Sequence, residues 1–116
     1  MDKVIVKSMK LSLIVFKDDN IYNIYCPALN LVGCGYTEKE AHESFNVVFE
    51  EYIRYTTENK TLIKDLEEHG WKIKDNGKKL TPPKMSELLQ NNNDLDNIFN
   101  NYDFNKYSIP LKMQLA

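Results

Sequence analysis

Short runs of apolar residues separated by turn residues mark the first third of the chain. These runs are residues 3–7, 11–17, 21–26 and 31–36. Their β-branched and large apolar side chains are typical of strands, and Asp18-Asp19-Asn20 predicts a hairpin turn after the second run. Residues 13–16 are all apolar, which predicts a central strand covered on both faces. Pro27 has no backbone N–H to donate to a neighbouring strand, so the strand predicted at residues 21–26 is expected to end there.

A long amphipathic helix is predicted to begin at residue 37. Thr37 and Glu40 form the T-x-x-E pattern of a capping box, which marks a helix start. An apolar stripe at three- and four-residue spacing then predicts one buried helix face. The stripe consists of Ala41, Phe45, Val48, Phe49, Tyr52 and Ile53. The predicted core combines Phe45, Val48, Phe49 and Tyr52 with Val15, Ile24 and Trp71.

A second, shorter helix and another strand are predicted after the long helix. Thr61 is the expected N-cap of the short helix, and Gly70 is expected to end it in a left-handed conformation. Residues 71–74 alternate with period two and predict a strand. Asp75-Asn76-Gly77 is predicted to be a turn, and the stretch that follows through residue 84, which includes Pro82-Pro83, is expected to be a linker or a stiff loop.

After residue 83 the composition changes, and asparagine becomes frequent. Residues 85–90 and 95–102 fit two short helices, which the asparagines weaken. The final segment alternates apolar and polar residues and predicts a half-buried strand, with Pro110 on its polar side indicating a sheet edge. Its apolar positions are Tyr107, Ile109, Leu111, Met113 and Leu115.

This terminal strand needs a sheet to pair with, because an unpaired apolar edge strand promotes aggregation. We expect it to pair across a two-fold axis and hold a homodimer, since closed two-fold dimers are the commonest assembly. Pairing within the monomer is the alternative.

The patterns together predict an α+β fold. Residues 1–80 form a β-β-β-α-β core, in which a small antiparallel sheet is backed by one long helix. Residues 81–116 form a C-terminal extension of two short helices that ends in an edge strand. A chain of 116 residues with 42% hydrophobic and 28% charged residues is sufficient for one packed core.

Charge and targeting signals narrow the class of protein. The net charge of −2 argues against a protein that coats nucleic acid. The longest apolar run, residues 13–16, is too short to span a membrane. The first ten residues lack the apolar segment of a signal peptide, so the two cysteines are expected to be reduced thiols in the cytoplasm.

The stretch from residue 26 to residue 45 holds the candidates for chemistry. Gly33 and Gly35 begin a dinucleotide-binding pattern, but Glu38 occupies the third glycine position and would repel a phosphate. The two glycines are therefore interpreted as sites of close backbone approach or of a bulge. Cys26 and Cys34 are eight residues apart, which is not the spacing of a zinc site.

No catalytic pattern is apparent. His42 and His69 could join the cysteines in principle, but nothing in the sequence brings them together, and His42 is interpreted as a partly exposed helix histidine. The strand at residues 11–17 contains no carboxylate of the kind that holds magnesium in nucleases of the RNase H type. We expect buried thiols, no metal, no cofactor and no enzyme activity.

The stretch nevertheless resembles the HicB family of antitoxins, in which a strand ending in Pro-x-Leu-x-x-x-Gly leads to Thr-x-x-Glu-Ala at a helix start. The matching residues are Pro27, Leu29, Gly33, Gly35, Thr37, Glu40 and Ala41. The resemblance covers roughly residues 10–74. It implies a sheet backed by the long helix, similar to a truncated RNase H core without the catalytic carboxylates. The implied function is to bind and inhibit a HicA-like toxin, a small basic ribonuclease.

The long helix offers a surface for such a basic partner. Residues 37–59 contain six acidic residues against two basic ones, and we expect Glu43, Glu50 and Glu51 to contact the toxin. Many HicB proteins also carry a DNA-binding module. Residues 81–116 have three lysines against four acidic residues and end in a strand, which argues against DNA binding. The alternatives are an orphan HicB-like domain that binds a small ligand or itself, and a degenerate RNase-H-like enzyme.

Overall fold

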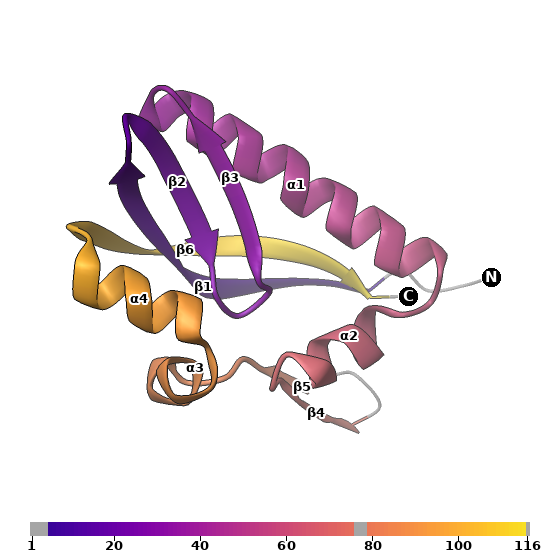
Figure 1. The fold of residues 1–116 in the computed structure, drawn as a ribbon. Helices are drawn as coiled ribbons and strands as arrows, with labels where there is room; N and C mark the ends of the chain where they lie inside the picture. The colour runs from indigo at the N-terminus through magenta and orange to yellow at the C-terminus, as the bar shows by residue number, and fades with distance from the viewer. Residues whose placement is uncertain (1–4, 76–78, 116) are drawn as a thin grey trace.

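The computed structural model of the protein describes residues 5–75 and 79–115 (Figure 1). At its centre lies a four-stranded antiparallel sheet with the strand order β3-β2-β1-β6. The strands are β1 (Ile5–Asp18), β2 (Ile21–Cys26), β3 (Leu31–Gly35) and β6 (Phe104–Leu115). The predicted α+β class with a small antiparallel sheet is confirmed.

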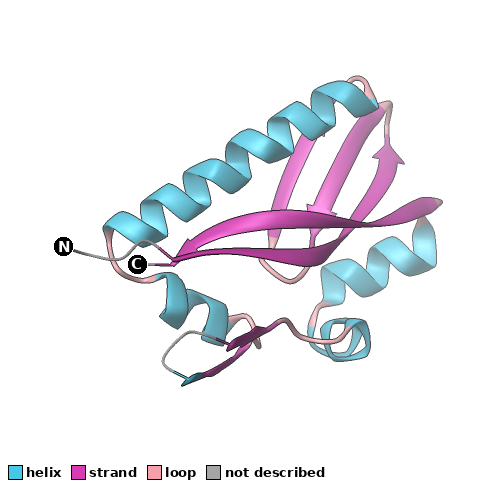
Figure 2. Cartoon of the chain, turned by 180° about the vertical axis from the view of Figure 1, so that it is seen from behind, coloured by secondary structure: helices cyan, strands magenta, loops and turns pink. Residues whose placement is uncertain are grey.

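β1 is the central strand of this sheet. It joins in one strand the predicted runs 11–17 and 3–7, of which residues 3 and 4 lie outside the described residues. Its last part, Ile14 to Asp18, pairs with β2, whereas Ile5 to Phe16 pair with β6. The first part of β1 and the last part of β6 therefore extend beyond β2 as a two-stranded ribbon (Figure 2).

Helices cover both faces of the sheet. α1 (Glu38–Glu58) lies on one face, where Leu13 and Val15 belong to the same buried cluster as Phe45. α3 (Met85–Asn91) and α4 (Asn93–Asn101) lie on the other face, where Ile14 is buried with Leu95 (Figures 1 and 2). Alternation along β1 sends neighbouring side chains to opposite faces, so the prediction of a strand covered on both sides is confirmed. Within the described ranges, no helix is long and apolar enough to cross a membrane.

The core beneath α1 contains most of the predicted residues. Phe45, Phe49, Val15, Ile24 and Trp71 belong to one buried cluster, and Tyr52 packs against it while partly buried. The Trp71 indole also donates a hydrogen bond of 2.7 Å to the carbonyl oxygen of Ala28. The prediction was wrong for Val48, which is half-buried and lies outside the cluster, because its position falls at the margin of the buried stripe.

The junction between β3 and α1 follows the predicted local chemistry. The Thr37 hydroxyl accepts a hydrogen bond from the Glu40 amide (3.1 Å), and the Glu40 carboxylate accepts one from the Tyr36 amide (2.9 Å). A methyl group at Gly33 would overlap the backbone of Phe45, and one at Gly35 would overlap the start of α1. The interpretation of both glycines as sites of close backbone approach is confirmed.

The strand predicted at residues 71–74 does not join the main sheet. β4 (Lys72–Lys74) pairs with β5 (Lys79–Thr81) in a separate two-stranded sheet, so the fourth core strand is β6 and not β4. The prediction of a linker or a stiff loop was wrong for residues 79–81, because β4 provides a strand with which they pair. The physical reason is that β1 already has a neighbour on each side. β3 forms the other edge of the sheet. There the backbone N–H of Cys34 donates a hydrogen bond to the Ser44 hydroxyl of α1, so this group is not open to pairing with β4.

The short helix α2 (Leu62–Glu68) is confirmed, with one correction at its start. Thr61 precedes the helix, but its side chain makes no capping hydrogen bond. Gly70 follows the helix with a φ of 88°, the left-handed conformation predicted for this glycine.

The terminal strand pairs with β1 of its own chain, which was the alternative to pairing across a two-fold axis. Its expected role as the pairing strand of a dimer therefore loses its basis, because β1 already satisfies one edge of β6. Its edge position in the sheet is confirmed. Tyr107 is exposed and Ile109 packs against the core, whereas the side chains of Leu111, Met113 and Leu115 lie outside the described side chains. Homodimerisation itself stays a prediction.

Replacing Phe49 with alanine tests the core under α1. Phe49 is buried and its ring stacks on Phe45, so we expect the free energy of unfolding to fall by about 3–5 kcal/mol. The measurement is a denaturant melt with linear extrapolation. Val47→Ala, on the exposed side of the same helix, is the control and should change stability by no more than about 0.5 kcal/mol. A loss below about 1 kcal/mol for Phe49→Ala would contradict this core assignment.

Candidate functional site

The solvent side of α1 forms the first candidate site. Glu43, Glu50 and Glu51, predicted to contact a partner, are all exposed there. Two large apolar side chains lie among them at helical spacing, Val47 with 59% and Tyr55 with 67% of its surface exposed. We call these five residues the α1 outer face.

The α1 outer face combines apolar area with uncompensated negative charge. Glu51 pairs with Arg54 at 2.6 Å, and both side chains are largely exposed. Among the described residues, Glu43 and Glu50 make no ion pair. Sequence reasoning missed Val47 and Tyr55, whose only signal was that they are apolar residues off the buried stripe.

The cysteines and histidines do not form a common site. Cys26 is buried at the end of β2, whereas Cys34 is exposed on β3, and both are free thiols. The expectation of two buried thiols was wrong for Cys34, because alternation along β3 places it opposite the buried Gly33. His42 is half-buried on α1, while His69 follows α2. In the part of the chain that the structure describes, no group of three or more His, Cys, Asp or Glu side chains could hold a metal ion.

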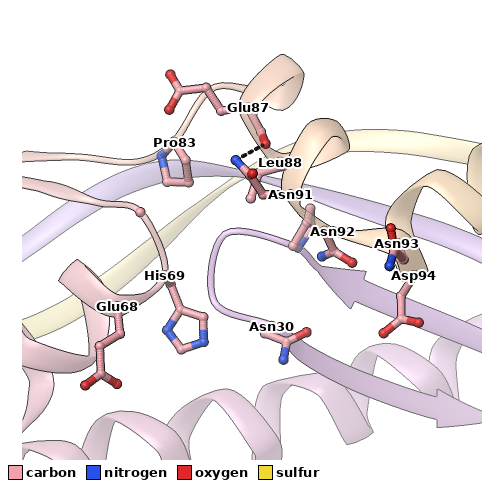
Figure 3. Close-up of a pocket in the computed structure, with 12 residues that line it drawn as sticks. Asn30, Glu68, His69, Pro83, Glu87, Leu88, Asn91, Asn92, Asn93 and Asp94 are labelled. Carbon is pink, nitrogen blue, oxygen red and sulfur yellow. Dashed lines mark hydrogen bonds between the residues drawn. The ribbon is translucent and has the colours of Figure 1, made fainter.

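A second candidate site is a polar cleft of about 640 Å³ on the side of the sheet that carries α3 and α4. Figure 3 shows Glu68 and His69 at the end of α2, Asn92 to Asp94 at the start of α4, and Asn30 from the β2–β3 turn. The lining residues are Pro27, Asn30, Glu68, His69, Gly70, Pro83, Glu87, Leu88, Asn91, Asn92, Asn93 and Asp94. Sequence reasoning did not find this cleft, because its walls come from four separate segments.

Hydrogen bonds hold the α4 wall of the cleft in place. The Tyr25 hydroxyl donates to the Asn30 side chain (2.8 Å) and accepts from the Asn92 amide nitrogen (2.7 Å). Asn92 is the N-cap of α4, and its side-chain oxygen accepts from the Leu95 amide (3.1 Å). Burial raises the pKa of Tyr25, so its hydroxyl keeps the proton that this network needs.

The α2 wall is held by a second set of hydrogen bonds. Nδ1 of His69 lies 2.7 Å from the backbone oxygen of Asp65 and 3.3 Å from its carboxylate. The Asp65 carboxylate also accepts a hydrogen bond from the hydroxyl of Tyr52, whose pKa is raised by burial and by this bond. Both groups that face Nδ1 are acceptors, so Nδ1 carries the hydrogen, and Nε2 is the acceptor of the neutral ring.

Comparison with known proteins adds no assignment to these sites. No protein-family model matches the chain, no curated protein matches its sequence, and no solved structure matches its fold. The resemblance to HicB antitoxins therefore rests on the sequence pattern of residues 27–41.

The two thiols are expected to differ sharply in reactivity. Burial raises the pKa of Cys26 to about 11, so only about one thiol in a thousand is ionised at pH 8, whereas Cys34 is exposed. In native protein a disulfide reagent should label Cys34 rapidly and Cys26 only after denaturant is added. Cys34→Ser should abolish the fast phase alone, and two fast thiols in the native protein would contradict the placement of Cys26.

Proposed function

We propose that this protein is a HicB-like antitoxin that binds and neutralises a small basic toxin of the HicA type through the α1 outer face. The observation that carries the proposal is the exposure of Val47 and Tyr55 among glutamates on one side of α1. The resemblance of residues 27–41 to the HicB pattern supplies the partner class.

The chemistry of the α1 outer face fits a protein partner with positive charge. Tyrosine is enriched among the residues that dominate binding energy, and an apolar centre with a polar rim is the usual anatomy of an interface. Glu43 and Glu50 would steer a basic protein toward this centre before contact. Glu51 forms an exposed ion pair with Arg54. When a basic side chain of the partner approaches, Glu51 can exchange this ion pair for one with the partner.

The enzyme alternative has less support. From Lys10 to Lys17, β1 contains no carboxylate, and Asp18 stands at its exposed end, where its carboxylate accepts a hydrogen bond from the Tyr102 hydroxyl (3.4 Å). A two-metal nuclease needs carboxylates that converge on the ions. The polar cleft is the feature that supports the alternative of a ligand-binding domain.

Purification of the tagged protein from its native host tests the proposed function. We expect a small basic protein to copurify in stoichiometric amount. Expression of that protein alone should arrest growth through RNA cleavage, and coexpression of this chain should restore growth. A copurified partner without toxicity, or toxicity that this chain does not relieve, would refute the antitoxin assignment.

Replacing Glu43, Glu50 and Glu51 with glutamine tests the docking surface. Loss of three exposed charges should slow association with the toxin by about three- to tenfold at low salt and flatten its salt dependence, because such charges act on the encounter rate. The measurement is the association rate constant by stopped flow or surface plasmon resonance.

The matched control carries the same change in net charge outside α1, in the exposed residues Asp75, Asp96 and Asp103, each replaced with asparagine. It should associate at nearly the unmodified rate. Equal rates for the glutamine variant and the unmodified protein at low salt would place the toxin on another surface.

A further inference from the structure

The polar cleft between α2 and α4 is preformed. Its α4 wall is held by the Tyr25–Asn92 hydrogen bond, and its α2 wall by the hydrogen bond from the Tyr52 hydroxyl of α1 to the Asp65 carboxylate, so both walls are positioned without a ligand. The volume of about 640 Å³ lies within the range of sites that take small molecules or single side chains. The cleft is separate from the α1 outer face, with which it shares no residue.

Apart from His69, the titratable side chains of the cleft lining are all carboxylates. It includes the carboxylates of Glu68, Glu87 and Asp94 and contains neither lysine nor arginine. Among the described residues, none of these three carboxylates makes an ion pair. An anionic ligand such as a phosphate would therefore meet only repulsion from these charges.

The side-chain hydrogen bonds leave further acceptors facing a ligand. The Asn91 amide nitrogen donates to the backbone oxygen of Glu87 (3.0 Å), which leaves the Asn91 side-chain oxygen as an acceptor (Figure 3). His69 uses Nδ1 on Asp65, which leaves Nε2 as an acceptor in the neutral ring. A fitting ligand thus carries positive charge together with several N–H donors.

We infer that the cleft binds the guanidinium or ammonium group of an organic cation. A bare metal ion fits less well, because the described residues contain no cluster of three potential ligands. A guanidinium group presents five N–H donors in a plane and matches carboxylate and amide oxygens that lie around a cleft. The group could belong to a free amine or to an exposed basic side chain of a protein, and these sources share the same chemistry.

Titration of the full chain with N-acetyl-arginine amide, followed by ¹H–¹⁵N NMR, tests the inference. N-acetyl-citrulline amide is the matched control ligand, because it has nearly the same shape without the charge. We expect the arginine compound to shift the amide signals of Asn93 and Asp94, and the citrulline compound to bind at least about tenfold more weakly. No shift at millimolar ligand, or equal binding of both compounds, would overturn the inference.

Substitution of the three cleft carboxylates tests whether the arginine compound binds in the cleft. The combination Glu68→Gln, Glu87→Gln and Asp94→Asn should weaken binding of the arginine compound by about tenfold, since one exposed ion pair contributes about two- to fivefold. The glutamine variant of the α1 outer face carries the same change in net charge and should bind it as the unmodified protein does. Equal weakening in both variants would overturn the inference, because it would reflect net charge alone.

Two further probes, putrescine and a tetrapeptide that contains one arginine, test whether the bound cationic group belongs to a free amine or to a protein side chain. Tighter binding of putrescine supports a free amine as the natural ligand, and tighter binding of the peptide supports a side chain of a protein partner. Binding of neither overturns the inference. Because the probes do not include the toxin, loss of the proposed antitoxin function would leave this result unaffected.

Discussion

The pairing of β6 with β1 is the constraint on which the rest of the structure depends. All 12 residues of β6 pair with β1, from Phe104 opposite Phe16 to Leu115 opposite Ile5. This ladder joins the C-terminal segment to the N-terminal strand and makes β1 central. It also anchors the chain after α4, so that α3 and α4 are held against the face of the sheet opposite α1. Without this cover, Ile14 and Tyr25 would lose the apolar neighbours Leu95 and Ile98.

Both candidate sites follow from this arrangement, in which the sheet lies between α1 on one face and α3 and α4 on the other. α1 buries Phe45 and Phe49 against the sheet, and its opposite side therefore presents Val47 and Tyr55 to solvent. The cleft forms where α4 begins beside the β2–β3 turn and the end of α2. Tyr25 connects these features, because its ring is buried under α4 while its hydroxyl holds Asn30 and Asn92 in the cleft wall.

Local patterns in the sequence were sufficient for the elements whose causes are local. The Thr37 cap, the close approach at Gly33 and the left-handed Gly70 each depend on a few neighbouring residues, and all were predicted. The missing Thr61 cap and the exposed Cys34 were local errors, whereas the errors in strand pairing occurred where the partner of a segment lies far away in the sequence. Residues 71–74 do form a strand, but its alternation carries no information about which sheet it joins. The asparagines near residue 92 weaken helices locally, yet Asn92 caps α4 and reaches Tyr25.

By itself the sequence determined the α+β class, the helices and the strands except β5, the buried stripe of α1, and the acidic character of its other side. Hydrophobic periodicity and capping chemistry act within one or two turns of chain, so they can be recognised without the fold. Only the tertiary structure decided that β6 pairs within its own chain, that Val47 and Tyr55 stay exposed, and that Asn30, His69 and Asp94 line one cleft. These outcomes depend on contacts between distant segments, such as that between Tyr25 and Asn92, which are 67 residues apart, and sequence periodicity does not encode such contacts.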